Sequence, residues 1–356
     1  MKATARVELR LCLCLTALAA CTATVLAAPI SFTVRETAGL RRFGYPVTAS
    51  LELPRGTFAG VDSARLLDAA GKELPAQFTA MSKWPDDSVR GLDVDFTSSI
   101  GPMEVQSYRV ESGGAAGRPG GRGLAVTETA GEITVASSVI AHKIRRDGKP
   151  LLTSIINGKT EYLAADGITT TLASGQAEVL KRGPFNVTLR LGPVMLEFVS
   201  SKSWVKIVQR AAAPADLAVH AHFSMPEPPV LWDFGVESWL YGSLRQPAET
   251  VLLRQHQSGW RVFTGAAEPS SAYASGRRCE GWGHLADKQR VVAFGMADFA
   301  VGGEPTFRLG ADGRFRAAAR RTELTVYFHV VGQPVQVTAL TSPPSMLSPL
   351  VLTVKK

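Results

Sequence analysis

The chain has 356 residues, of which 45% are hydrophobic, and its formal net charge at pH 7 is +8. This length is enough to bury large cores and predicts about two domains. The basic residues are scattered along the sequence rather than clustered, so the charge is compatible with an acidic partner but argues against a nucleic-acid-binding protein.

The N-terminal residues have the pattern of a secretory signal. Three positive charges precede an apolar run over residues 11–28, and no polar stop-transfer flank follows the run. We expect a signal peptide at residues 1–27, cleavage before Ala28, and export to the periplasm or the exterior of a bacterial cell. The rest of the sequence has no apolar run of about 18 residues, so no transmembrane span is expected.

The motif LAAC at residues 18–21 leaves a second form of export open, because it matches a lipoprotein box that would make Cys21 a lipid-bearing N-terminus. We favour ordinary cleavage, since apolar residues continue past Cys21 where a lipoprotein usually becomes polar. With ordinary cleavage, Cys279 is the only cysteine of the mature protein, and no internal disulfide can form.

Residues 83–96, KWPDDSVRGLDVDF, combine a turn with an amphipathic strand. Pro85 presets the first corner of the turn, and the two aspartates after it can accept hydrogen bonds from turn amides. Side chains alternate between the two faces of a strand, so one face carries Leu92, Val94 and Phe96. The opposite face carries Asp93 and Asp95. Arg90 falls in line with the apolar set, so we expect it to pair with Asp86 or Asp87.

This turn has three open interpretations. It can be architecture, held by a local ion pair with Trp84 as a lid, and we favour this interpretation. It can be a saccharide platform in which Trp84 stacks on a sugar while Asp86 and Arg90 bind its polar groups. A glycosidase site with paired carboxylates is disfavoured, because adjacent side chains on one turn cannot easily flank a bond from opposite sides.

A glycine-rich segment divides the chain. Residues 111–123, ESGGAAGRPGGRG, contain six glycines and no large apolar side chain, which predicts a linker or long loop over residues 113–123. We expect one domain at residues 28–112 and a second at residues 124–356.

The second segment alternates apolar and polar residues, as in NVTLRLG (186–192) and ELTVYFHV (323–330). Turn signals such as Asp147-Gly148 and Asn157-Gly158 separate such runs, and no capped helical pattern of helix length is present. These features predict an all-β protein built from antiparallel sandwiches or barrels.

Three stretches carry a resemblance to a known family: RRFGYPVTASLELPRGTF, RLLDAAGKELPAQFTAMSKWPDDSVRGLDVDF and QSYRVESG. Their order resembles the N-terminal RIFT barrel domain of the exo-rhamnogalacturonan lyase-like family. At the turn, the family has a glycine where this chain has Asp87. After the turn arginine, the family commonly has an aromatic residue, whereas this chain has Gly91. A looser similarity to the family's central β-sandwich includes WRVFTG, GRRCEGWGHLADKQRVVAFGMADF and GEPTFRLGADGRFRAA.

The resemblance implies a small RIFT-type barrel followed by an antiparallel β-sandwich, in a protein that works on polysaccharide. Family lyases continue into a large α/α toroid, whereas this sequence ends in a β-like pattern at Lys356. The catalytic architecture of the family is therefore expected to be incomplete here, and the resemblance assigns no catalytic residue.

One stretch of the second domain could support chemistry. Elimination from a uronate needs a cation at the carboxylate, a base and an acid. In AYASGRRCEGWGHL (272–285), Arg278 could neutralise the carboxylate, and Tyr273 or His284 could exchange a proton. Arg277 could also bind a carboxylate, and Trp282 could stack on a sugar. The alternative, which we favour, is an irregular solvated loop anchored by Trp282.

Two histidines, His220 and His222, have a spacing on one strand face that could hold zinc or copper. A third ligand, such as His256 or Glu237, would have to come from elsewhere, so we expect no metal. Nearby aromatic residues are expected in the core and rim of the sandwich: Trp232, Trp239 and Tyr241. The sequence contains no phosphate-binding glycine loop, Gly-x-Ser-x-Gly elbow or Cys-x-x-Cys pair, so no cofactor is expected.

These features predict a secreted, carbohydrate-associated protein that binds or processes acidic, uronate-containing polysaccharide or oligosaccharide as a noncatalytic or accessory module. One alternative is a polysaccharide lyase that cleaves uronate glycosidic bonds by β-elimination. Another is a structural or assembly protein of the cell envelope, in which exposed strand edges pair with a partner chain.

Overall fold

The computed structural model describes residues 29–113, 123–172, 175–237, 240–265, 272–331 and 343–354. The expected signal peptide, Cys21 and most of the glycine-rich segment lie outside these ranges. Antiparallel strands make up nearly all of the regular structure, which confirms the expected all-β class. Among the described residues, no helix has the length and apolar character needed to cross a membrane.

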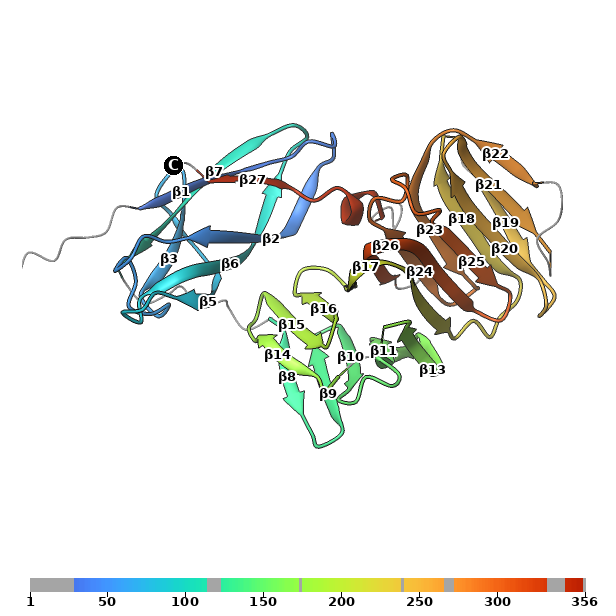
Figure 1. The fold of residues 1–356 in the computed structure, drawn as a ribbon, viewed down its shortest axis with the longest axis horizontal. Helices are drawn as coiled ribbons and strands as arrows, with labels where there is room; N and C mark the ends of the chain where they lie inside the picture. Colours follow the sequence, from blue (N-terminus) through green and yellow to red (C-terminus); the bar gives the residue numbers. More distant parts are fainter. Residues whose placement is uncertain are drawn as a thin grey trace, which may run out of the picture.

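The first unit consists of two antiparallel sheets (Figure 1). The three-stranded sheet has the order β2 (Arg42–Glu52), β6 (Val89–Ile100) and β5 (Gln77–Lys83). The five-stranded sheet has the order β27 (Val351–Val354), β1 (Ile30–Arg35), β7 (Val105–Ser112), β3 (Ala64–Asp68) and β4 (Glu73–Leu74). The RIFT-barrel topology that the resemblance implies stays a prediction.

Alternating apolar side chains from both sheets fill the core of the first unit. At its centre, the rings of Phe32, Phe96 and Tyr108 lie with centroids 4.9–6.1 Å apart. Aromatic pairs at such separations stabilise a core beyond the apolar area that they bury.

The last described strand belongs to the first unit, not to the second as the expected boundary at residues 124–356 implied. β27 pairs with β1, with Leu352 opposite Val34, and the picture shows β27 lying in the sheet of the first unit (Figure 1). Met346 and Leu350 are buried in the core of that unit. The physical reason is that β27 covers an edge of β1 that would otherwise have unpaired backbone groups.

The second unit is organised around two long strands, β17 (Trp204–Phe223) and β26 (Arg314–Val331), which pair along most of their length. The pairing register shifts between Arg210 and Ala215. The strands on each side of this shift have different neighbours, so β17 and β26 contribute to two sheet halves.

In the first half, β16 pairs with the beginning of β17 and β24 with the end of β26. Its further strands are β14 (Glu178–Lys181), β15 (Asn186–Leu191), β16 (Val194–Val199), β24 (Val291–Met296), β23 (Cys279–Ala286), β18 (Val230–Val236) and β19 (Leu240–Leu244).

In the second half, β13 pairs with the end of β17 and β25 with the beginning of β26. Its further strands are β8 (Ala125–Glu128), β9 (Glu132–Ala136), β10 (Ile140–Arg145), β11 (Leu152–Asn157), β12 (Thr160–Glu161), β13 (Leu163–Thr170), β25 (Thr306–Gly310), β20 (Thr250–His256), β21 (Gly259–Thr264) and β22 (Ala274–Gly276).

The two halves pack face to face around phenylalanine side chains. Phe294 of β24 lies 5.0 Å from Phe307 of β25 and 4.8 Å from Phe315 of β26, measured between ring centroids. Phe234 of β18 also faces Phe307, with centroids 6.5 Å apart. This arrangement confirms the expected sandwich-like packing.

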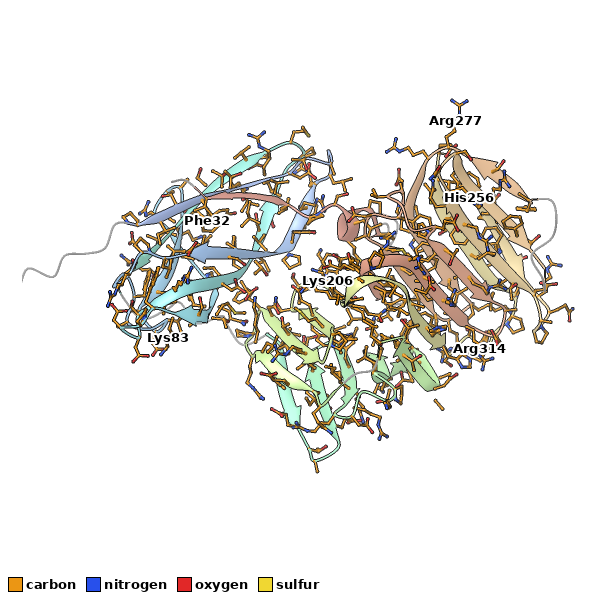
Figure 2. The ribbon with its side chains drawn as sticks, viewed as in Figure 1. Phe32, Lys83, Lys206, His256, Arg277 and Arg314 are labelled. Atoms are coloured by element: carbon orange, nitrogen blue, oxygen red, sulfur yellow. The ribbon has the colours of Figure 1, made fainter. Side chains whose placement is uncertain are left out.

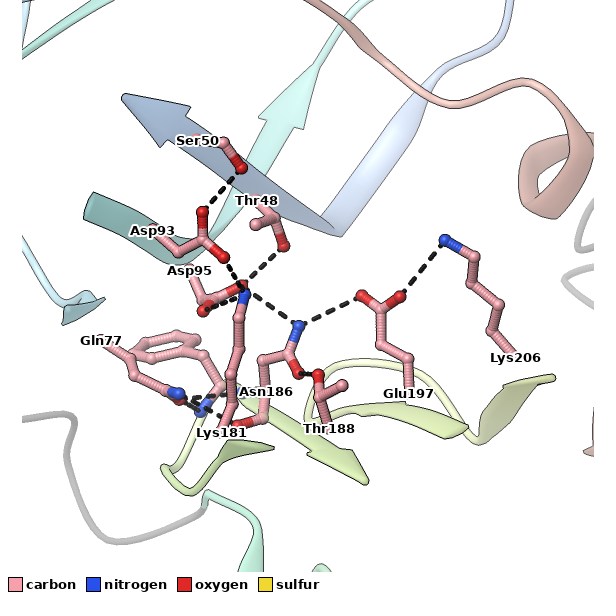
Figure 3. Close-up of polar contacts among 11 residues, drawn as sticks. Thr48, Ser50, Gln77, Asp93, Asp95, Lys181, Asn186, Thr188, Glu197 and Lys206 are labelled. Carbon is pink, nitrogen blue, oxygen red and sulfur yellow. Dashed lines mark hydrogen bonds and ion pairs between the residues drawn. The ribbon is translucent and has the colours of Figure 1, made fainter. Parts of the chain in front are cut away.

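A buried polar network joins the two units (Figure 3). The Lys181 ammonium of β14 lies 2.7 Å from Asp93 Oδ2 and 3.3 Å from Asp95 Oδ2, both on β6. Asn186 Nδ2 donates to Asp95 Oδ1 over 3.1 Å, and the backbone amide of Asn186 donates to Gln77 Oε1. The polar face of β6 predicted from the sequence is therefore buried against the second unit.

His142 of β10 is a buried titratable group with a limited set of partners. Its side chain packs against the Phe198 ring at 4.8 Å, and its buried Nδ1 atom has no hydrogen-bond partner among the residues that the structure describes. Burial lowers the pKa of His142 to about 4, although a hydrogen bond to the Val135 backbone acts in the opposite direction.

We expect acidification to destabilise the protein through His142. The unfolded chain takes up the proton near pH 6.5 and the folded chain near pH 4, so stability is complete above pH 6.5 and falls between these values. At about 1.4 kcal/mol per pKa unit, the loss reaches up to about 3 kcal/mol. Urea unfolding of the wild type and of His142→Leu at pH 7 and pH 4.5 measures this loss of stability. Equal pH dependence of stability in the two proteins would contradict the prediction.

Candidate functional site

A row of basic and polar side chains crosses the outer face of the second sheet half. Arg316 of β26 lies directly opposite His220 of β17 on one side and opposite Arg308 of β25 on the other. Thr169 of β13 continues the row beyond His220. The residues that alternate with them, including Val219, Ala317 and Phe307, are buried in the sandwich core, so the row points away from it.

The turn between β25 and β26 fixes this register. Gly313 has a φ of +85°, and a Cβ atom there would lie 2.0 Å from the Phe223 carbonyl oxygen. Only glycine allows this turn to pass so close to the end of β17. The tight hairpin then places Arg308 and Arg316 side by side.

The surface around the row is hollowed. One hollow of about 670 Å³ is lined by His220, Arg308, Arg316 and neighbouring residues of β13 and β20. A second hollow of about 410 Å³ shares Arg316 and extends along β26 past Ala318 to Arg320. Ala318 has too small a side chain to fill the space between the two arginines. We call these two hollows, which share Arg316 and lie along β26 from Arg314 to Arg320, the basic groove.

Acidic residues line both hollows of the basic groove, with Asp166 and Asp312 at the end near Arg314, and Asp216 and Glu304 at the end near Arg320. At one end, Arg314 binds Asp312 over 2.6 Å, and at the other Arg320 lies 3.4 Å from Asp216. In the part of the chain that the structure describes, Arg308 and Arg316 form no ion pair.

Like charges directly opposite on neighbouring strands are destabilising. Burial, and after it the charge of Arg316, lower the pKa of His220 below its usual value. The centre of the groove thus has excess positive charge that an anionic ligand would relieve.

The histidine pair does not form a metal site. The Nδ1 atom of His222 bonds to the Asp166 carboxylate, and its Nε2 atom lies 3.1 Å from the Asp312 carbonyl oxygen. Both ring nitrogens of His222 are therefore occupied. Within the described ranges, no group of three or more His, Cys, Asp or Glu side chains is placed to hold a metal ion.

The turn at residues 84–90 is held by different contacts from those expected. Arg90 pairs with Glu52 over 3.0 Å, not with Asp86 or Asp87, because the β2–β6 register places Glu52 beside it. Asp86 instead binds Arg55 over 2.7 Å. Hydrogen bonds, first from the Ser88 hydroxyl and then from Arg55, lower the pKa of Asp86 to about 2.

These contacts occupy the polar groups that a sugar would need at this turn. The Arg90 guanidinium lies 4.8 Å from the centre of the Trp84 ring, and Trp84 Nε1 donates to the Leu53 carbonyl. Asp87 takes a φ of +63°, a left-handed conformation in which glycine is favoured.

The second predicted cluster lies largely on strands, since residues 274–276 and 279–286 form β22 and β23 rather than a loop. Glu280 connects Arg278, at 3.6 Å, to Trp282 Nε1, at 2.8 Å. The Trp282 ring lies edge-on to His284 at 5.8 Å. His284 is buried, and its Nδ1 atom is 2.8 Å from Asp233 Oδ1.

Tyr273 and Arg277 lie apart from this chain of contacts. Tyr273 is exposed and meets the Trp232 ring at 6.5 Å. Arg277 projects from the end of the sandwich opposite to that of Arg314 (Figure 2). Glu237 accepts hydrogen bonds from Trp260 Nε1 and the backbone amide of Arg277, which lower its pKa to about 2. Catalysis by Tyr273, Arg278 and His284 stays a prediction.

The aromatic residues near this cluster differ in exposure. Trp232 is buried in the core as expected, whereas Tyr241 is exposed at the rim. Trp239 lies outside the described residues.

The arginines of the basic groove were missed by the sequence analysis. Their signal is present in FRLGADGRFRAAAR (307–320), where arginines alternate with apolar residues on both sides of an Asp-Gly turn. A three-residue hairpin loop, Ala311-Asp312-Gly313, with the glycine in the left-handed conformation places Arg308 opposite Arg316. No sequence feature, however, indicated that β17 would add His220 to the same row.

Comparisons with known proteins leave the family open. No family model matches the sequence, and no curated protein matches it. The crystal structure of HI1317 aligns with 60% of this chain and 98% of its own, at 11% identity and a TM-score of 0.34. The uncharacterised protein lmo2446 from Listeria monocytogenes EGD-e aligns with 86% of this chain, at 11% identity and a TM-score of 0.22.

The same Listeria protein was also solved with α-D-glucose, β-D-glucose, magnesium and calcium, and that structure gives a TM-score of 0.21. This chain spans 30% of the length of lmo2446. Likeness at these TM-scores carries no functional argument.

Proposed function

We propose that this protein is a secreted carbohydrate-associated module that binds acidic, uronate-containing polysaccharide in the basic groove. The observation that carries the proposal is the row of His220, Arg316 and Arg308, in which neither arginine has an acidic partner among the described residues. A planar guanidinium binds a carboxylate through two parallel hydrogen bonds, so each arginine can hold one uronate.

The shape of the groove supports a linear ligand. From Arg314 to Arg320, the outward side chains of β26 follow one line, and at about 3.3 Å per residue this line is about 20 Å long. Such a length accommodates several sugar units of a polysaccharide. Binding of polysaccharide outside the cell agrees with the expected export. It also agrees with the resemblance to the RIFT-barrel domain of the exo-rhamnogalacturonan lyase-like family. Export and this family relationship are themselves part of the proposal.

The test is binding of the mature protein to polygalacturonate and alginate, with a neutral galactan as the reference polymer. We expect Arg308→Ala and Arg316→Ala each to weaken binding about tenfold or more, because each removes hydrogen bonds to a charged group. Affinity should also fall as salt is added, since exposed charges are screened. Isothermal titration calorimetry measures both effects.

Arg190→Ala is the matched control, because Arg190 is an exposed strand arginine paired with Glu178 in the other sheet half. It should bind as the wild type does. Equal binding of uronate polymers by the wild type and the double variant Arg308→Ala/Arg316→Ala refutes the proposal.

A second candidate function is a uronate lyase at the same groove, and the position of His220 beside Arg316 favours it. Arg316 would neutralise the carboxylate, and His220 would remove the proton on the adjacent carbon. The electron pair would form a carbon–carbon double bond, the glycosidic bond would break, and the departing oxygen would take a proton from water. Absorbance of unsaturated ends, followed during the binding assay, separates the two functions: binding without absorbance change rejects the lyase.

A further inference from the structure

A separate cavity lies where the two units and the C-terminal segment meet. Its volume is about 230 Å³. β2 contributes Tyr45 and Thr48, the second unit contributes Glu197 and Lys206, and residues 346–352 close one side. We call it the junction pocket. Pockets for drug-sized ligands have volumes of about 300–1,000 Å³, so the junction pocket has room for a smaller molecule such as a single ring.

Aromatic side chains form one wall of the junction pocket. The Trp204 ring lies edge-on between Tyr45, at 5.9 Å, and Tyr327, at 6.4 Å. Burial raises the pKa of Tyr327 above its ordinary value, so its hydroxyl stays protonated. Within the described residues, that hydroxyl has no hydrogen-bond partner, and it is available to a ligand.

A carboxylate and an ammonium group form the polar edge. Lys206 Nζ lies 3.2 Å from Glu197 Oε2, and the two side chains are 33% and 26% exposed, respectively. A hydroxyl group both donates and accepts hydrogen bonds. Two neighbouring hydroxyls of a ring could therefore bind this pair together, donating to Glu197 and accepting from Lys206.

The acid of this pair is held in place by the network between the units (Figure 3). Asn186 Nδ2 donates to Glu197 Oε1 over 3.1 Å and also to Asp95 Oδ1. Asn186 itself is buried. The polar edge is thus positioned before any ligand arrives, which reduces the entropy that binding must overcome.

We propose that the junction pocket binds a neutral monosaccharide, with the sugar ring against the aromatic wall and adjacent hydroxyls on Glu197 and Lys206. A neutral ligand fits because the two charges compensate each other, in contrast to the excess positive charge of the basic groove. The two sites lie on different parts of the second unit, so this proposal is independent of polysaccharide binding in the groove.

The experiment is a titration of the full chain with D-glucose, D-galactose and L-rhamnose, in which saturation-transfer NMR detects binding. Glycine is titrated in the same way, as a zwitterion that could bind the two charges without a sugar ring. We expect saturable binding of at least one sugar. Glu197→Gln and Lys206→Met should weaken it about tenfold or more, since each alters a hydrogen bond to a charged group. Tyr327→Phe removes one hydroxyl and keeps the ring, so it tests the pocket without disturbing the fold.

Glu323→Gln is the matched control, because Glu323 forms an exposed pair with Arg210 between β26 and β17, the strands that carry Tyr327 and Lys206. This variant should keep wild-type sugar binding, as should Arg308→Ala. The proposal is overturned if none of the three sugars binds saturably, or if glycine binds instead. It is also overturned if Glu197→Gln, Lys206→Met and Tyr327→Phe all bind sugar as the wild type does. Polygalacturonate binding should be unchanged in the pocket variants, so the two proposals fail separately.

Discussion

The variant Asp95→Ala is expected to lose about 3–5 kcal/mol of unfolding free energy, the usual cost of breaking a buried ion pair by removing one partner. The side chains of Lys181, Asp93 and Asp95 are 7%, 11% and 2% exposed. Removal of Asp95 leaves the Lys181 ammonium buried with a single carboxylate and takes an acceptor from Asn186. Urea unfolding at pH 7 measures the loss.

A matched control for Asp95→Ala is Glu178→Ala, which breaks the pair with Arg190 on the neighbouring strand. Those side chains are 56% and 51% exposed, and exposed pairs contribute about 0–1 kcal/mol. A loss of similar size in both variants would show that the buried network between the units adds no more stability than a surface pair.

Arg42→Ala is expected to destabilise the protein by a similar amount, about 3–5 kcal/mol, for the same physical reason. Arg42 is buried and lies 3.0 Å from the buried carboxylate of Glu36. It also donates to the backbone carbonyls of Ser345 and Ser348. The variant should therefore also loosen β27, which amide hydrogen exchange of residues 351–354 would detect as faster exchange.

The stability that the Arg42–Glu36 pair contributes depends on pH through the carboxylate of Glu36. Burial alone would raise the pKa of Glu36, but hydrogen bonds from the Met103 amide and Arg42 hold it below its usual value. Stability from this group is present above pH 4.5 and is lost as the pH falls through the lower folded pKa. Arg35→Ala, at an exposed position of β1, is the control. Unchanged exchange of β27 in Arg42→Ala would contradict the prediction.

Local patterns were sufficient to predict the strands but not their long-range partners. The alternation in residues 186–191 and 323–330 corresponds to β15 and the end of β26, as expected. The pairing of β27 with β1 joins opposite ends of the described chain, and no local signal encodes it. Arg90 illustrates the same limit, since its partner Glu52 is set by the register between β2 and β6.

The candidate site shows why chemistry was harder to predict than structure. His220 was considered together with His222 as a possible metal ligand, but in the proposed site it lies beside Arg316 and Arg308 on neighbouring strands. Conversely, the residues from Arg277 to His284 are close in sequence, yet Arg277 projects from the end of the sandwich while His284 is buried. Proximity in sequence overestimates proximity in space when a strand passes from the rim into the core.

The position of β27 has a consequence for the order in which the protein assembles. The first unit requires residues 346–354 to complete its core and sheet, so it cannot mature before nearly all the described chain has been made. Contacts between such distant residues form slowly, because a long loop must close first. In a nascent chain the sandwich could thus already be folded while the sheet of β1 awaits its final strand.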